Sequence, residues 1–203
     1  MSIPSQTTTP LSTQTSSVYW IRGIVFTALF SALFIAFSWI KVPLGYTSVP
    51  ITLQTLAVML AGGLLGAVYG FWSILIVLLL TATGLPLLHG NGGLPLIFGA
   101  TGGFIWMFPI AALLIGLVSD KLFRSSKTLN AKSIVILFIS IIAFGIVLVY
   151  ITGVPWLAYK ANYTLSAALK GGCYPFLLGD IIKAVVAVVL IRTLRPLLPK
   201  FRK

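Results

Sequence analysis

Asp180 and Lys183 are the residues whose types and spacing point most directly to chemistry. The sequence contains two acidic residues, and one of them, Asp180, begins a long apolar run with Lys183 three positions later. Residues three apart share one face of a helix. A carboxylate only accepts hydrogen bonds and an ammonium only donates them. The pair therefore suits a ligand carrying N–H groups and a carbonyl or anionic oxygen, while a purely structural ion pair is the competing interpretation.

The composition places this pair in a membrane. The sequence is 59% hydrophobic and 8% charged, with a mean hydropathy of +1.09, whereas a soluble domain has about 25% charged residues. We expect an all-α, polytopic membrane protein, because the apolar runs are continuous rather than alternating as in a transmembrane barrel. Ionisable residues inside a membrane are costly and usually mark a functional site.

Four apolar runs are long enough for the roughly 20 helical residues that cross a bilayer; they lie near 20–40, 99–119, 133–153 and 176–195. The segment 51–80 would reach roughly 45 Å as one helix, which is too long for a hydrocarbon core about 30 Å thick. Its glycine-rich middle, 61–66, predicts a break between two short helices. The sequence thus predicts six helices, of which the second and third are short.

The basic residues indicate the orientation of these helices. With six spans and both ends of the chain inside, ten basic residues fall on the inner side and three on the outer side, which agrees with the positive-inside rule. The inner residues are Arg22, Lys121, Arg124, Lys127, Lys132, Arg192, Arg195, Lys200, Arg202 and Lys203, and the outer ones are Lys41, Lys160 and Lys170. Charge alone does not exclude a single helix over 51–80.

Three outer loops follow from this topology, at 41–50, 81–98 and 154–175. Pro175 suits a first helical position, and Asp180 then lies about 7 Å farther along its helix. The outer loops and the Asp180–Lys183 face therefore share one side of the membrane, where they predict a pocket that opens to the outside.

The loop 83–95 contains a second group of candidate residues. Five glycines and prolines between Gly84 and Leu94 exclude a helix. The segment is either a flexible loop or a re-entrant segment whose backbone, including Gly92 and Gly93, lines a cavity. Asn91 offers both a donor and an acceptor. We expect His89 to be an exposed loop residue rather than a catalytic base.

Small residues form three further patterns. The segment 99–104, which contains Thr101, is expected to open the fourth helix, where its glycines allow close packing or close approach of a ligand. Ala28, Ala32 and Ala36 repeat every four residues on the first helix, and a second stripe of glycines has the same period. Such stripes form packing seams, and the stripe on the first helix could instead face another subunit.

Several kinds of function are disfavoured. The single cysteine, Cys173, excludes an internal disulfide and a cysteine metal cluster, and one histidine with two acids makes a metal site improbable. We find no nucleotide-binding or hydrolase motif, and we predict neither catalytic residues nor a cofactor. Residues 1–18 are polar and predict a disordered tail, followed by a single membrane domain over 19–203.

An ordered set of segments resembles the BioY family, the biotin-binding S components of energy-coupling factor (ECF) vitamin transporters. The resemblance rests on Val49-Pro50-Ile51-Thr52-Leu53-Gln54-Thr55, Leu60-Ala61-Gly62-Gly63-Leu64-Leu65-Gly66, Thr83-Gly84-Leu85-Pro86, Gly92-Gly93, Gly99-Ala100-Thr101-Gly102-Gly103-Phe104 and Pro175-Phe176-Leu177-Leu178-Gly179-Asp180-Ile181-Ile182-Lys183. The family usually has a proline at the position of Ala100, a small departure.

The resemblance implies an S-component fold and uptake of biotin from outside the cell with high affinity. It implies association with a transmembrane coupling protein and two ATPases, so that ATP is used only by partner subunits. The stripe of Ala28, Ala32 and Ala36 matches the alanine motif through which S components contact the coupling protein. No nucleic acid is expected as a partner, and a bacterial plasma membrane is the implied location.

The resemblance also implies roles at the site. Asp180 accepts N–H bonds from the ureido ring of biotin, Asn91 bonds to the same ring, and Lys183 either pairs with Asp180 or donates to a ligand oxygen. Gly92, Gly93 and Thr101 are further candidate ligand contacts, and Tyr174, Phe98 and Trp156 are candidates to cover the apolar rings.

Three alternatives stay open at this stage. They are a self-sufficient secondary carrier for a small solute, an S component for another vitamin, and an intramembrane enzyme that uses Asp180 and His89. The scarcity of acids disfavours the carrier and the enzyme.

Overall fold

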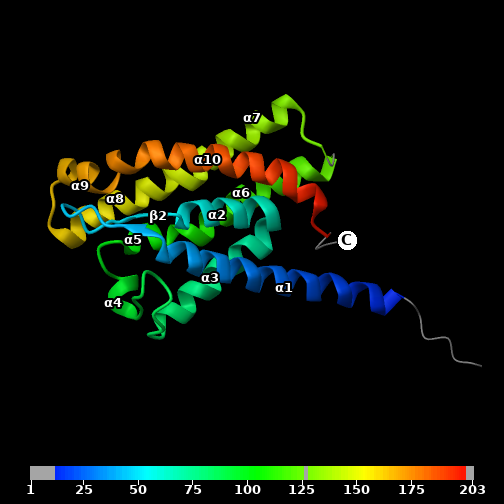
Figure 1. Ribbon diagram of the computed structural model, residues 1–203, viewed down its shortest axis with the longest axis horizontal. Coiled ribbons are helices and arrows are strands. Elements are labelled where there is room, and N and C mark those ends of the chain that lie inside the picture. Colours follow the sequence, from blue (N-terminus) through cyan, green and yellow to red (C-terminus); the bar gives the residue numbers. More distant parts are fainter. Residues whose placement is uncertain (1–11, 126–127, 200–203) are drawn as a thin grey trace, which may run out of the picture.

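The computed structural model describes residues 12–125 and 128–199. Helices dominate it, with one short two-stranded sheet at one end (Figure 1). The elements are α1 (Ser12–Trp39), β1 (Lys41–Val42), β2 (Ile51–Thr52), α2 (Gln54–Leu65), α3 (Ala67–Ala82), α4 (Leu94–Ile97), α5 (Gly102–Ile105), α6 (Met107–Ser125), α7 (Ala131–Ser140), the π-helix η1 (Ile141–Val147), α8 (Leu148–Ala161), α9 (Leu165–Gly172), α10 (Tyr174–Leu194) and the 3₁₀-helix η2 (Arg195–Leu197).

Within these residues, four helices are long and apolar enough to cross a membrane, namely Val18–Trp39, Gly102–Arg124, Ala131–Ala161 and Tyr174–Leu197. Two shorter apolar helices, α2 and α3, lie between the first and second of them. This pattern confirms the predicted count of six helices with a short second and third. The chain is therefore a multi-pass membrane protein.

The break between α2 and α3 lies at Gly66. Its φ of 81° and ψ of −176° belong to a region of backbone conformation that essentially only glycine adopts. A Cβ here would also lie 2.2 Å from Oδ1 of Asp120. The predicted break is confirmed at the C-terminal edge of the 61–66 segment, while Gly62 and Gly63 belong to α2.

Asp120 closes this break from α6. Its Oδ2 accepts the backbone N–H of Ala67 at 3.0 Å, which satisfies a free donor at the start of α3. Arg195, at the end of α10, pairs with the Asp120 carboxylate and donates to the carbonyl of Gly63 at 2.7 Å. Asp120 was predicted to be an ordinary loop residue, but in the structure it joins α3, α6 and η2.

The two stripes of small residues differ in burial. Gly62, Gly66 and Gly70 are buried, and a Cβ on Gly62 would lie 2.3 Å from the carbonyl oxygen of Ala112 on α6. This stripe is a packing seam within the bundle. The alanine stripe on α1 is exposed at all three positions, so it is not an internal seam.

The loop predicted at 154–175 is largely helical. The fifth span continues through Pro155 to Ala161, and α9 follows. Leu157 is fully buried, and Nε1–H of Trp156 donates to the carbonyl of Gly99 at 2.8 Å. This packing offsets the local cost of a proline inside a helix, which is why the prediction ended the helix too early.

Two other boundaries also differ from the prediction. The fourth span begins at Gly102 rather than at Gly99, and it is interrupted at Trp106, where Pro109 has no N–H to donate to the carbonyl of Ile105. Helix α1 begins at Ser12, because a helix extends readily once an apolar segment has nucleated it. Residues 12–18 of the predicted tail are therefore helical, and residues 1–11 lie outside the described part.

The loops gather at two ends of the bundle. The β1–β2 hairpin, α4, α5 and α9 lie at one end, and the start of α1, the end of α6, the start of α7 and the end of α10 lie at the other (Figure 1). In the sheet, Lys41 pairs with Thr52 in antiparallel register. The glycine-rich and basic connections are thus on opposite sides, as the charge pattern predicts.

Candidate ligand-binding site

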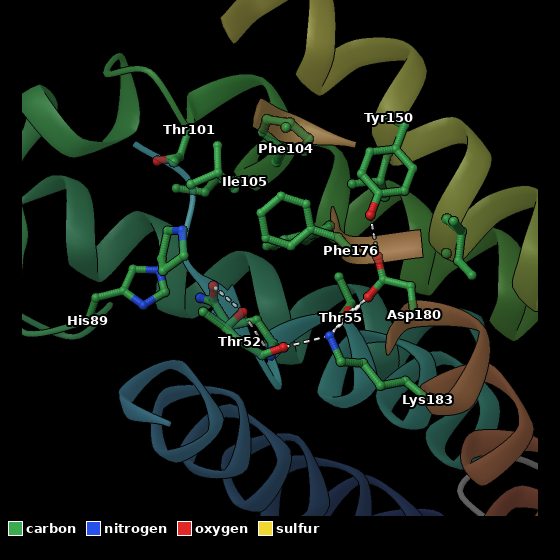
Figure 2. A pocket seen from close by; sticks show the side chains of 18 residues that line it. Thr52, Thr55, His89, Thr101, Phe104, Ile105, Tyr150, Phe176, Asp180 and Lys183 are labelled. Atoms are coloured by element: carbon green, nitrogen blue, oxygen red, sulfur yellow. Dashed lines mark hydrogen bonds and ion pairs between the residues drawn. The ribbon is translucent and has the colours of Figure 1, made fainter. Parts of the chain in front are cut away.

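A cavity of about 600 Å³, counting its open mouth, lies beside Asp180. Segments far apart in the chain contribute its walls, including the β1–β2 loop, α2, α5, α8 and α10 (Figure 2). The lining residues are Val49, Pro50, Thr52, Gln54, Thr55, His89, Thr101, Phe104, Ile105, Phe108, Gly145, Ile146, Val149, Tyr150, Gly172, Phe176, Asp180 and Lys183.

Asp180 is the buried acid of this cavity, with 4% of its surface exposed. Its Oδ1 accepts from Nζ of Lys183 at 2.9 Å and from the hydroxyl of Thr55 at 3.1 Å. Its Oδ2 accepts from the hydroxyl of Tyr150 at 2.5 Å. Figure 2 shows these donors converging on the carboxylate from three helices. A carboxylate has about four acceptor sites, so roughly one is left for a ligand N–H.

Lys183 is fully used by the protein. Besides Asp180, its ammonium donates to the carbonyl of Thr52 at 2.6 Å and to the hydroxyl of Thr55 at 3.2 Å. These three bonds match the three N–H groups of an ammonium. The predicted pairing on one helix face is confirmed, and in this structure Lys183 holds Asp180 and the start of α2 rather than presenting a free donor.

Aromatic side chains form much of the remaining wall. Phe104 and Tyr150 meet edge to face with centroids 6.2 Å apart, and Phe108 and Phe176 are buried beside the cavity. Aromatic faces of this kind suit an apolar ring. The site therefore combines a few fixed polar groups with a mainly apolar wall, the usual character of a small-molecule pocket.

His89 closes another side of the cavity. It is half-buried and lines the cavity, so the prediction of an exposed loop residue is wrong. Its Nδ1 lies 2.7 Å from the carbonyl of Ser38, which requires Nδ1 to carry a hydrogen. Burial lowers the pKa of His89, and the nearby charge of Lys41 lowers it further. Its backbone has a φ of 57°, and hydrogen bonds to Ser38 at the end of α1 hold the turn that carries it.

The structure brings three predicted site residues to the cavity, Asp180, Lys183 and Thr101. The other candidates do not line it, namely Asn91, Gly92, Gly93, Phe98, Tyr174 and Trp156. Asn91 donates weakly to the carbonyl of His89, 3.4 Å away. Gly92 packs so tightly that a Cβ would lie 2.2 Å from the carbonyl oxygen of Leu85. For these residues, contact with a ligand stays a prediction.

The aromatic candidates belong to a separate cluster. The Trp106 ring contacts the tilted ring of Trp156 at a centroid distance of 4.4 Å and meets Phe98 edge to face at 5.4 Å. Lys160 lies over the Trp156 ring, 5.1 Å from its centroid. Tyr174 is exposed. Phe98 and Trp156 therefore pack away from the cavity lining.

The prediction missed several lining residues, among them Gln54, Thr55, Tyr150 and Phe176. Gln54 and Thr55 stand in a motif that carried the family resemblance, so that motif held a signal for the site. Tyr150 and Phe176 lie in apolar runs, where nothing in the sequence marks which side faces a cavity.

Comparisons with known proteins agree with one another. A model of the BioY family matches residues 6–200. A protein named biotin transporter BioY from Rhizobium etli is 40% identical over 185 residues, which cover 88% of this chain and 97% of that protein. A protein of the same name from Lactococcus lactis is 35% identical over 180 residues, covering 86% and 91%.

A solved structure is also similar. It is the crystal structure of the S-component for biotin from an ECF-type ABC transporter, with a TM-score of 0.79 and 32% sequence identity. The match covers 92% of this chain and 94% of the solved one. The fold of an S component therefore extends over nearly all of the chain.

Proposed function

The chain belongs to the BioY family, and from this premise we propose that it is the biotin-binding transmembrane subunit, the S component, of an ECF-type ABC transporter for biotin uptake. The relatives named above are biotin transporters, and the similar solved structure is a biotin S component. A protein of this kind captures its ligand and releases it unchanged, so it needs no catalytic residue.

The buried Asp180 carboxylate is the observation that best supports biotin as the ligand. Biotin carries a ureido ring with N–H donors next to apolar carbons and a thioether. Asp180 has an acceptor site to spare, and Lys183 holds its carboxylate in place. Charge-assisted bonds to the ureido ring would orient it, while Phe104, Phe108 and Phe176 contact the apolar rings.

Transport requires partners. We infer a transmembrane coupling protein and two ATPase subunits of an ECF module, which hydrolyse ATP on behalf of this chain. The exposed stripe of Ala28, Ala32 and Ala36 supports contact of α1 with the coupling protein, because small residues allow another helix to approach closely.

The orientation is part of the proposal. Basic residues concentrate at the end of the bundle that holds the α6–α7 connection and the described ends of the chain. By the positive-inside rule this end is cytoplasmic. The cavity then belongs to the outer half of a plasma-membrane protein, since the β1–β2 loop and His89 line it.

The direct test is a calorimetric titration of biotin into the purified chain in detergent, with thiamine and riboflavin as controls. We expect saturable binding of biotin in the nanomolar range and no binding of either control. A folded sample that binds no biotin, or that binds a control as tightly, would contradict the proposal.

A further inference from the structure

Gln54 is a buried polar residue at the cavity to which neither the sequence nor the proposed function gives a role. It is the first residue of α2, has 4% of its surface exposed, and lines the cavity. Among the described residues, its Nε2 is the buried side-chain nitrogen that has no hydrogen-bond partner. An unpaired buried donor is destabilising, so its presence on a cavity wall needs an explanation.

In this structure the side-chain amide of Gln54 presents its oxygen to Thr52. The Thr52 hydroxyl oxygen accepts the backbone N–H of Gln54 at 3.3 Å, and the hydroxyl donates its own hydrogen to Oε1 of Gln54 at 3.4 Å. The carbonyl end of the side chain is therefore occupied. The amide nitrogen is left with two N–H groups and no acceptor.

Other donors near Gln54 are already spent. The hydroxyls of Thr55 and Tyr150 donate to Asp180, and all three N–H groups of Lys183 are bonded within the protein. A ligand carbonyl that enters next to Asp180 would find no free donor among these three side chains. Gln54, adjacent to Thr55 in the chain, supplies one.

We propose that Gln54 determines specificity by donating from Nε2 to the carbonyl oxygen of the ureido ring, while Asp180 accepts from a ring N–H. This inference rests on the proposed function, because it assumes that the ligand is biotin. The oxygen and both N–H groups of a ureido ring are attached to one carbon atom, and the proposed donor and acceptor line the same cavity. Gln54 is unpaired without ligand and paired with it.

The experiment compares biotin with 2-iminobiotin, in which a protonated imine replaces the ureido oxygen at neutral pH. Both are titrated into the parent and into Gln54→Met, which keeps the length of the side chain but removes its donor. We expect biotin to bind at least about tenfold more weakly to the variant, in line with a lost hydrogen bond to a buried group. The affinity for 2-iminobiotin should change by less than about threefold, since it offers no acceptor.

Two further variants sharpen the comparison. Gln54→Glu replaces the donor with an acceptor, so it should shift the preference from biotin toward 2-iminobiotin. Leu56→Met is the control. Leu56 belongs to the same helix but does not line the cavity, so this variant should leave the affinities for both ligands unchanged. Without ligand, Gln54→Met should melt no lower than the parent, because it removes the unpaired donor.

The outcomes separate the two proposals. Parent protein that binds no biotin contradicts the proposed function. Parent protein that binds biotin, together with Gln54 variants that weaken both ligands equally or neither, overturns the role of Gln54 alone and leaves the proposed function standing.

Discussion

The carboxylates of Asp180 and Asp120 are held in different ways. Asp180 is buried and receives three donors from side chains around a cavity. Asp120 is more exposed, at 44% of its side chain, and it caps a helix and pairs with Arg195. The same side-chain type therefore serves a binding site at one place and helix packing at another, and the difference follows from burial and donors.

Matched substitutions should separate these roles. Asp180→Asn removes the charge that strengthens a bond to a ligand N–H, so we expect biotin affinity to fall by about 1.5–3 kcal/mol, or roughly 10- to 150-fold. Asp120→Asn should leave the affinity within about threefold while lowering the melting temperature, because Arg195 loses its counter-charge. Calorimetry and thermal melting check both variants, and unchanged binding by Asp180→Asn would refute the central role of Asp180.

His89 should make stability depend on pH. Its pKa in the folded protein lies below its ordinary value of 6.5, so folding favours the neutral form. The stabilisation is complete above pH 6.5 and is lost as the pH falls from there through the lowered pKa. The chain has one histidine, and no other side-chain type ordinarily titrates in this range.

The check is the melting temperature of the detergent-solubilised chain between pH 8 and pH 5. We expect a decrease of a few degrees on the acid side of pH 6.5, and a flatter profile for His89→Asn, since asparagine tolerates the positive φ at this position. An equal decrease in both proteins would assign the effect to another group.

The individual residues of the site could be predicted from the sequence only in part. Asp180 and Lys183 stand out because charges are rare in apolar runs. Tyr150, Thr55 and Phe176 do not, because whether such a side chain faces lipid or a cavity depends on packing between distant helices. Asn91 and Phe98 do not line the cavity in this structure, and their contact with a ligand stays a prediction.

Among the elements, the break between α2 and α3 is the most sharply constrained. Gly66→Ala should destabilise the protein by about 3 kcal/mol or more, since it adds backbone strain to a clash with Asp120. Gly179→Ala is the matched control, because Gly179 lies within α10 with no atom within 4 Å of an added Cβ. That variant should be neutral or stabilised by up to about 1 kcal/mol. Thermal melting without ligand compares the two, and similar melting temperatures would contradict this account of the break.

The predicted elements differ from the structure where tertiary contacts override local signals. Glycine at a break is a local signal, and the break was predicted. Pro155 is a local signal too, but Leu157 and Trp156 pack inward and keep α8 helical beyond it. The π-helix η1 was not anticipated, because apolar residues there give no cue for a change of hydrogen-bond register.

For the molecule as a whole, two polar networks hold opposite sides of the helix bundle. Around Asp180, one network joins α2, α8 and α10 beside the cavity. Around Arg195, the other joins α2, α6 and η2, which directly follows α10, near the basic end. The continuous α10–η2 segment takes part in both, through Asp180 and Lys183 at one network and Arg195 at the other.

The proposed orientation can be tested on the intact molecule. In a Cys173→Ser background, Tyr46→Cys should react with a membrane-impermeant maleimide on intact cells, because Tyr46 is 67% exposed in the loop between β1 and β2. Lys121→Cys, near the basic α6–α7 connection, should react only after the membrane is permeabilised. In the parent protein, which keeps Cys173, this thiol should react slowly with the maleimide, since burial and then the charge of Asp180 raise its pKa. Labelling of Lys121→Cys alone on intact cells would invert the topology and place the cavity in the cytoplasmic half.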